Sequence, residues 1–308
     1  MPEDADIAPL RSILTSVAWA VGKTIEANGG FDPKHGSQAA TEIANQGPFV
    51  ARSKTPVLDA HSIALMRLAS ATDHFTAIAR LLEAPPVAAY GPASLARTAL
   101  ENSARAWRAF DPALDLKTRI GRGRTDVIVN LKEALRALGA IEKIGTPQEL
   151  ALNRKMRDKT SIILKDIVED SDRIGLTPVR NKNGEVIGIV EAAVGPTAAI
   201  TEQLGPMGRL AYNDLSAVAH GTLSGLVGRL EEVDQMTTVR GVKLMTPSVN
   251  MPNLRNAIAI SLLSYREATD RRMSLYGWDM TYWNAWKTES ARLMASLLRG
   301  AGQGSANS

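Results

Sequence analysis

The spacing of apolar residues constrains the fold of this chain more than any other feature of its sequence. Between residues 7 and 25, large apolar side chains recur every three or four positions, which is the period of an amphipathic α-helix. These side chains are Ile7, Leu10, Ile13, Leu14, Val17, Val21 and Ile25. Proline and glycine divide similar patterns along the chain into long segments. The sequence therefore predicts an all-α fold, a multi-helix bundle of eight or nine helices.

Capping signals and chain breakers predict the helix ends. The first helix should end at Asn28-Gly29-Gly30, and residues 31–54 should form a loop with at most a short helix near 39–45. Gly121 and Gly123 weaken the first half of one later helix, because glycine lowers helix propensity. Later helices are expected over 55–83, 92–110, 114–138, 146–172, 206–231, 252–276 and 279–299, with a short helix between 195 and 206.

A small β-hairpin interrupts the helical pattern near 179–190. Asn183-Gly184 stands there between β-branched residues, which is a strong signal for a tight hairpin turn. A second segment, 236–249, is compatible with a short strand or a loop. No linker-like stretch separates two halves of the chain. We therefore expect one helical domain over 1–300 and a flexible tail over 301–308.

Composition excludes several classes of protein. The chain has no cysteine, so disulfides, thiolate catalysis and cysteine-bound zinc are excluded. No apolar run is long enough to cross a bilayer, and the acidic N-terminus lacks the pattern of a signal peptide. The four histidines form no zinc-binding pair at helical spacing. We expect a cytoplasmic protein with no membrane association, no metal and no cofactor.

Two polar residues fall on the apolar face of the predicted helix 55–83. Arg67 and His74 are seven residues apart, so they lie two turns, about 10 Å, from each other on one stripe. A buried arginine without a partner is costly, so this position requires a carboxylate or an opening to solvent. Two interpretations are open. The pair is either a candidate catalytic site or an interior ion pair beside a structural histidine.

A second polar stripe follows the predicted helix 206–231. Arg209, Tyr212, Ser216 and His220 cluster within about 80° of arc, and Ser216 and His220 can meet because they are four residues apart. No acidic third member or oxyanion-hole motif accompanies the Ser–His pair. A hydrogen-bonded structural stripe between helices is the alternative to nucleophilic catalysis.

A third group lies on the predicted helix 92–110, where Arg97 and Glu101 begin a charge ladder. If another helix covers this ladder, Glu101 is the expected counter-ion of Arg67. The ladder opens a basic stretch, 97–124, that would suit a nucleic acid or another anionic partner, although a solvated helix face also explains it. The basic residues are Arg97, Arg105, Arg108, Lys117, Arg119, Arg122 and Arg124.

Three short motifs within residues 55–230 resemble a group of uncharacterised helical proteins common in actinobacteria. They are Asp73-His74, the segment from Leu95 to Glu101 followed by Trp107 and Asp111-Pro112, and the segment from Tyr212 to Thr222. The resemblance implies that His74, Arg97, Glu101, Ser216 and His220 gather at one polar centre.

The layout is also similar to HEPN-like helical bundles. Arg67 and His74 fit the Arg-x(4–6)-His pattern of HEPN ribonucleases, which act as dimers, although Leu68 stands where that family often has a polar residue. This resemblance implies that histidine acts as general acid or base and that arginine holds phosphate.

The sequence is compatible with three functions. The first is a partner- or ligand-binding or structural module with an interior polar cluster. The second is a metal-independent HEPN-type ribonuclease that uses His74 or His220 with Arg67 or Arg97. The third is nucleic-acid binding, for example of RNA, through the basic stretch. Trp283 and Trp286 share one helical face, which indicates core packing or a homodimer contact.

Overall fold

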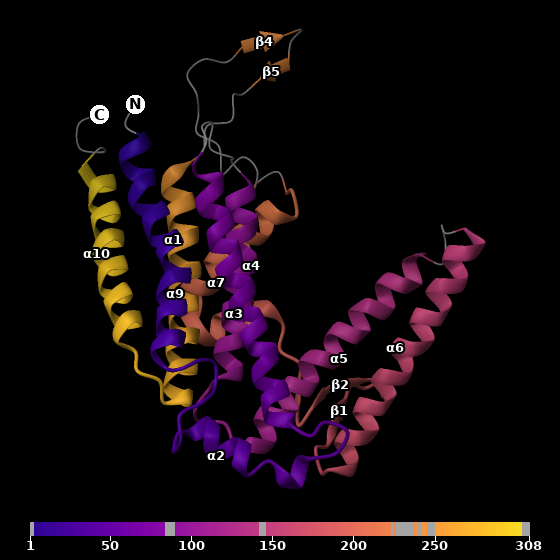
Figure 1. Cartoon of the computed structure of the whole chain (residues 1–308). Helices are drawn as coiled ribbons and strands as arrows, with labels where there is room; N and C mark the ends of the chain where they lie inside the picture. The colour runs from indigo at the N-terminus through magenta and orange to yellow at the C-terminus, as the bar shows by residue number, and fades with distance from the viewer. Residues whose placement is uncertain are drawn as a thin grey trace. The chain divides into compact units, whose positions relative to one another are not determined.

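A computed structural model of the chain describes residues 3–83, 90–141, 146–222, 225, 237–239, 242–244 and 250–303 (Figure 1). These residues form nine α-helices and one short 3₁₀ turn, Gly47–Phe49. The predicted all-α fold with a small β-hairpin is confirmed. The helices are α1 (Glu3–Ala27), α2 (Gln38–Ala44), α3 (Pro56–Leu81), α4 (Gly91–Ala109), α5 (Leu116–Ile141), α6 (Pro147–Arg173), α7 (Pro196–Ala219), α9 (Met251–Tyr276) and α10 (Thr281–Gln303).

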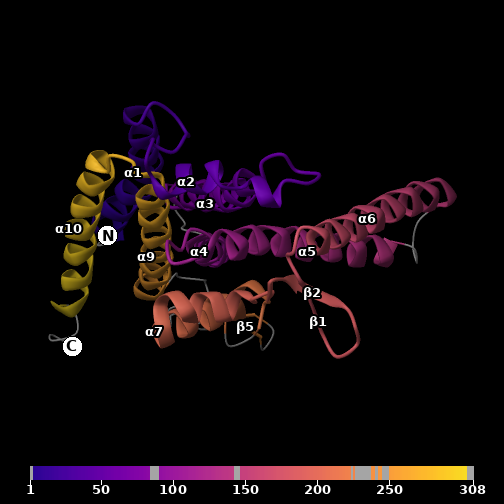
Figure 2. The same ribbon diagram turned by 90° about the horizontal axis from the view of Figure 1, so that it is seen from below.

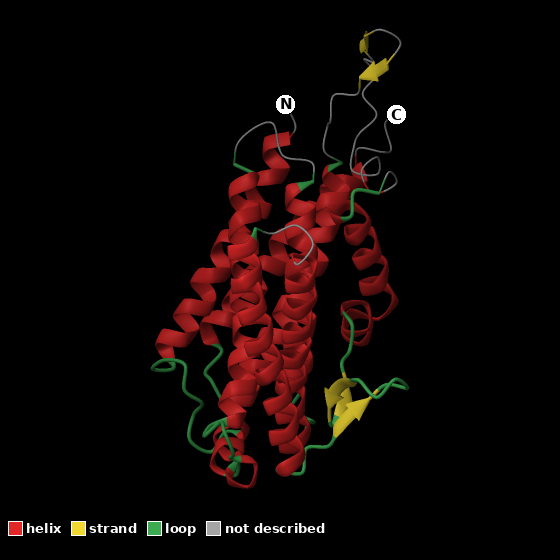
Figure 3. Cartoon of the chain, turned by 90° about the vertical axis from the view of Figure 1, so that its right-hand side faces the viewer, coloured by secondary structure: helices red, strands yellow, loops and turns green. Residues whose placement is uncertain are grey.

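The strands are few and short (Figure 3). The predicted hairpin consists of β1 (Pro178–Arg180) and β2 (Val186–Ile189), which pair antiparallel on either side of a turn that contains Gly184 at φ +78°. A third strand, β3 (Glu191–Ala192), pairs with β2 and was not predicted. Val190, between them, has φ +66°, a conformation in which the chain reverses and which a β-branched residue rarely adopts. In the segment 236–249, β4 (Thr237–Val239) and β5 (Val242–Leu244) form a two-stranded ladder.

Contacts group the chain into two compact units. The bundle unit comprises Met1–His35, Met66–Arg108 and Pro196–Ser308, and the hairpin unit comprises Gly36–Leu65 and Ala109–Gly195. Helix α3 contributes its first ten residues to the hairpin unit and the rest to the bundle unit. The single domain over 1–300 stays a prediction, and residues 304–308 of the predicted tail lie outside the described residues.

Helix α9 forms the centre of the bundle unit, with 15 of its 26 residues buried. A helix that is buried on most of its sides lacks a solvated face, and α9 accordingly shows no strong apolar stripe in its sequence. Helices α1 and α10 lie side by side (Figure 1). Trp283 and Trp286 are buried and stacked, with ring centroids 4.6 Å apart. Of the two roles predicted for these tryptophans, packing in the core is the one observed.

Helix α7 differs from its prediction in one respect. The expected short helix and the following helix join across a kink at Gly205, which has φ +65°, and the joined helix ends at Ala219. The chain leaves this helix through Gly221 at φ +63°, with the amide of Thr222 donating to the carbonyl of Ala217. Such a left-handed glycine closes a helix. Of the predicted continuation to residue 231, residues 223, 224 and 226–231 lie outside the described residues.

In the hairpin unit, α5 and α6 run side by side in antiparallel directions (Figure 2). The start of α6 has the capping box expected from the sequence, in which Thr146 and Glu149 satisfy each other's backbone N–H groups. The first half of α5, the later turns of α6 and the β-hairpin together enclose an apolar core. The buried members of this core are Val57, Ile120, Ile128, Leu176, Val186 and Ile189.

Helices α3 and α5 approach very closely at Gly123. A Cβ atom added to Gly123 would lie 2.6 Å from the Cβ and 2.7 Å from the Cα of Ala60. A Cβ added to Gly121 would lie 2.8 Å from Cγ2 of Val190. Both glycines are therefore required by packing, although the sequence indicated only that they weaken the helix.

We predict that Gly123→Ala destabilises the protein by about 1–3 kcal/mol, because the added methyl group overpacks the contact with Ala60. Gly139→Ala is the matched control in the same helix, since a Cβ at Gly139 meets nothing within 4 Å. The control should gain up to about 1 kcal/mol from helix propensity. Urea unfolding of the two variants measures the difference. Equal stabilisation by both substitutions would contradict the close approach.

Candidate functional site

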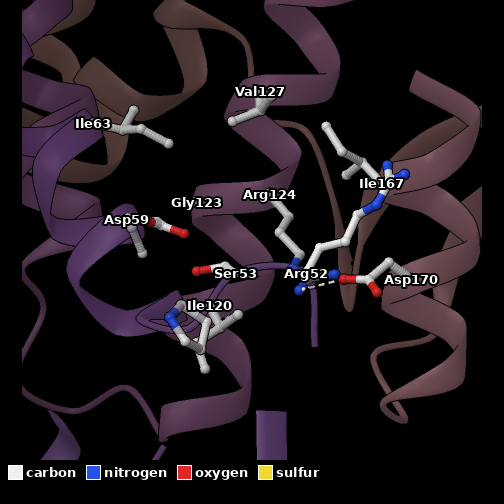
Figure 4. Close-up of a pocket in the computed structure, with 12 residues that line it drawn as sticks. Arg52, Ser53, Asp59, Ile63, Ile120, Gly123, Arg124, Val127, Ile167 and Asp170 are labelled. Carbon is white, nitrogen blue, oxygen red and sulfur yellow. Dashed lines mark hydrogen bonds and ion pairs between the residues drawn. The ribbon is translucent and has the colours of Figure 1, made fainter. Parts of the chain in front are cut away.

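A pocket of about 160 Å³ lies within the hairpin unit, between the start of α3, the first half of α5 and the last turns of α6 (Figure 4). Its wall is mostly apolar, and a few polar side chains stand at its rim. A concave, largely apolar site with few polar groups is the usual form of a small-molecule site. The lining residues are Arg52, Ser53, Pro56, Asp59, Ala60, Ile63, Ile120, Gly123, Arg124, Val127, Ile167 and Asp170.

Helical spacing explains how the sequence builds this pocket. Asp59 and Ile63 are four residues apart at the start of α3, so both project toward the same side (Figure 4). Gly123 and Val127 bear the same relation on α5. Because Gly123 has no side chain, the backbones of α3 and α5 approach closely there, and Gly123 forms part of the pocket wall.

The two arginines of the pocket are already neutralised. Arg124 donates one hydrogen bond of 3.1 Å to Oδ2 of Asp170 and another of 2.9 Å to Oγ of Ser171. Arg173 pairs with the same aspartate. Both Arg124 and Asp170 are largely buried, so their ion pair is shielded from water. Arg52, at the rim, forms an ion pair with Asp166.

Asp59 is the exception among the charged residues of the pocket. Its carboxylate has no hydrogen bond or ion pair with any described residue, and it faces the pocket opposite Gly123 (Figure 4). The backbone amide of Asp59 donates to the carbonyl of Thr55, which holds the residue in the first turn of α3. The pocket thus combines an apolar wall with one unpaired negative charge.

The polar group expected on α4 is present in the bundle unit. Nη2 of Arg97 lies 2.8 Å from Oε1 of Glu101, and the hydroxyl of Tyr212 donates to the same carboxylate oxygen at 3.0 Å. Arg97 also donates to the Tyr212 oxygen at 3.1 Å and lies over the tyrosine ring. These three predicted residues are therefore brought together, with the two charged side chains half-buried.

The other members of the stripe on α7 do not join this cluster. Arg209 and His220 are exposed and Ser216 is half-buried, and none of their side chains has a hydrogen bond or ion pair to the described chain. Only Tyr212 faces the interior, because it lies at the edge of the stripe that turns toward α4. Ser216 and His220, which can meet by their spacing, form no side-chain hydrogen bond with each other in the described part of the chain.

Arg67 and His74 are both half-buried in the bundle unit. The ring nitrogen Nδ1 of His74 lies 2.6 Å from the carbonyl oxygen of Ser70. Because a carbonyl oxygen only accepts hydrogen bonds, His74 carries a proton on Nδ1, and in the neutral ring Nε2 keeps its lone pair. Glu101, the expected counter-ion of Arg67, binds Arg97 and Tyr212, and its pairing with Arg67 stays a prediction.

Most of the basic stretch 97–124 is paired with carboxylates. Arg119 is fully buried and binds Glu42 of α2 through Nε at 2.7 Å, a contact that sequence reasoning missed because only tertiary packing brings the two residues together. Arg108 pairs with Glu202 at 2.7 Å and Arg122 with Glu191 at 2.6 Å. With Arg97 and Arg124, five of the seven basic residues have acidic partners. Nucleic-acid binding by this stretch stays a prediction.

Among the described residues, no group of three or more histidine or carboxylate side chains is placed to hold a metal ion. None of the described helices has both the length and the apolar content needed to span a bilayer. Comparisons with protein families, with curated proteins and with solved structures find no match to this chain.

Proposed function

We propose that this protein binds a small organic amine with an apolar body in the pocket of the hairpin unit. The observation that carries the proposal is the exposed carboxylate of Asp59, which lies beside the apolar wall of the pocket and has no partner among the described residues. An ammonium group would donate to this carboxylate, and the charge-assisted hydrogen bond would fix the orientation of the ligand. Ser53, also at the rim, offers a hydroxyl to a second N–H of the same group.

The apolar part of the ligand is limited by the size of the pocket. A cavity of about 160 Å³ is close to the 150 Å³ of an engineered apolar cavity that binds benzene. Ile63, Val127 and Ile167 provide the corresponding wall. One ring or a short branched alkyl group therefore matches the available space, and burial of its surface would supply most of the binding free energy.

An anionic ligand fits the pocket less well. Its negative charge would face Asp59 and would have to compete with Asp170 for Arg124. Displacing one member of a buried ion pair leaves an uncompensated charge, which is strongly unfavourable. The charge pattern therefore favours a cation over a carboxylate or phosphate.

We predict that benzylamine binds with a Kd of about 0.1–1 mM at neutral pH, measured by isothermal titration calorimetry. Benzyl alcohol and benzoate have similar apolar bodies without the positive charge, and both should bind more weakly. Asp59→Asn should reduce benzylamine affinity about five- to tenfold, because one charge-assisted hydrogen bond is lost.

Asp158→Asn is the matched control for this experiment. Asp158 is an exposed carboxylate on α6 that does not line the pocket, so its removal should leave the affinity unchanged. Equal binding of benzylamine and benzoate, or equal effects of the two substitutions, would contradict a role for Asp59.

A second candidate function is metal-independent RNA cleavage at His74. The observation in its favour is the tautomer, because a neutral imidazole with Nδ1 protonated offers Nε2 as a general base toward a ribose 2′-hydroxyl. Arg67, on the same helix, is the proposed phosphate-binding residue. This candidate uses the bundle unit and makes no use of the pocket.

For this second candidate, we predict cleavage of single-stranded RNA in the presence of EDTA and its loss in His74→Ala. His35→Ala is the control, since His35 is an exposed histidine outside the helices. Gel analysis of labelled RNA between pH 6 and 8 gives the result. Absence of cleavage by the folded wild-type protein over this range would eliminate the ribonuclease.

A further inference from the structure

The distal half of α6, residues 147–163, lies beside α5 without forming an apolar core (Figure 2). In this half only Asn153 is buried, and its amide donates to the carbonyl of Leu138 on α5. No described residue of α5 after Ile128 is buried either. Helices in proteins gain most of their stability by burying an apolar face. Two helices that bury so little therefore gain stability when a further helix covers them.

Four exposed side chains of the distal half form a continuous stripe, which we call the α6 seam. They are spaced by four, three and four residues, the alternation that keeps one face of a helix turned toward a partner helix in coiled coils. Placing residues 100° apart puts all four within about 60° of each other. The members of the seam are Leu152 (59% exposed), Met156 (49%), Lys159 and Ile163 (38%).

The α6 seam is positively charged. Residues 150–163 carry four basic side chains and one acidic side chain, a net charge of +3. Lys159 belongs to the seam and Lys155 lies at its edge, and neither lysine has an ion pair with any described residue. The acidic residue of this stretch, Asp158, lies about 120° from Leu152 around the helix and so points away from the seam.

The nearest carboxylates at the two ends of the seam already have partners. Glu149, before the seam, forms the capping box with Thr146, and Asp166, after it, forms an ion pair with Arg52. The seam thus presents three large apolar side chains together with positive charge that the chain itself does not neutralise.

A second copy of this chain does not supply the missing negative charge. If two seams pair antiparallel and in register, Leu152 of one copy meets Ile163 of the other, and Met156 meets Lys159. The lysines at 155 and 159 of both copies then gather in the middle of the contact. A parallel pair places each lysine beside its own equivalent. Because like charges repel across a contact, the seam favours a partner of opposite charge.

We infer that the α6 seam binds an acidic amphipathic helix of another protein. Apolar residues of that helix cover Leu152, Met156 and Ile163, as in other complexes where a helix lays its apolar face on a helical surface. A carboxylate at one of its core positions pairs with Lys159. In coiled coils, a single charged or polar residue at a core position determines the register and the choice of partner.

The inferred contact is separate from the proposed amine site. The seam ends at Ile163, and the α6 residues that line the pocket, Ile167 and Asp170, follow it along the chain. The inference therefore does not rest on the proposed function, and either can fail without the other.

A synthetic acidic peptide of about three heptads tests the inference with the full-length chain. The peptide has leucine at the a and d positions and glutamate at e and g, and one glutamate replaces the central core leucine. Repulsion among its own glutamates opposes self-association at neutral pH. Fluorescence anisotropy of the labelled peptide should show saturable binding of one peptide per chain. Binding should weaken as the salt concentration rises.

Lys159→Glu and Arg154→Glu form a matched pair for this experiment. Both reverse one exposed positive charge of α6, but Arg154 lies about 140° from Lys159 around the helix. Lys159→Glu should weaken peptide binding at least about tenfold, because two carboxylates then face each other. Arg154→Glu should change the affinity less than about twofold. A peptide with lysine in place of the central glutamate should bind Lys159→Glu more tightly than it binds the wild-type protein.

Circular dichroism establishes that both variants retain their helices. A folded wild-type protein that shows no saturable binding of the acidic peptide, or equal losses of affinity in Lys159→Glu and Arg154→Glu, would overturn the inference. Vesicles of phosphatidylcholine with phosphatidylserine provide a second arm. If the wild-type protein sediments with these vesicles but does not bind the peptide, the seam contacts an anionic lipid surface, and the inferred protein partner is wrong.

Discussion

The close approach of α3 to α5 is the constraint on which the proposed pocket depends. Gly123 meets Ala60 without space for a single methyl group, so the two helix backbones are held at a fixed separation. That separation places Asp59 and Ile63 opposite Arg124 and closes the pocket on one side. Protein interiors are packed so densely that one added carbon atom at such a contact must displace neighbouring atoms. The glycine therefore determines the shape of the pocket through the position of the helix that carries it.

Ion pairs within the chain determine which of its charged side chains are left to bind a ligand. Most of the basic stretch 97–124 is paired with carboxylates of the same chain, such as Glu42 for Arg119. Buried pairs of this kind fix packing more than they add stability. Asp59, which lines the pocket, is informative for the opposite reason, because its carboxylate has no partner among the described residues.

The helices could be predicted from the sequence because apolar periodicity, proline and glycine act locally, and the Asn183-Gly184 turn followed for the same reason. The cluster of Arg97 and Glu101 was also within reach, since four-residue spacing brings two side chains together on any helix. The pocket could not be predicted from the sequence, because residues 52–63 and 120–170 meet only through tertiary packing. Helical spacing could indicate that Asp59 and Ile63 share a side, but it could not show what faces them.

Methyl NMR of the four branched residues that line the pocket shows directly whether an amine binds there. During titration with benzylamine, the methyl signals of Ile63, Ile120, Val127 and Ile167 should shift together and saturate at one dissociation constant. Signals of distant methyl groups, such as those of Ile13 in the core of the bundle unit, should stay unchanged. In Asp59→Asn the same four signals should need a higher amine concentration to reach saturation. The proposed site would be contradicted if the chemical shifts of other methyl groups changed while those of these four residues did not.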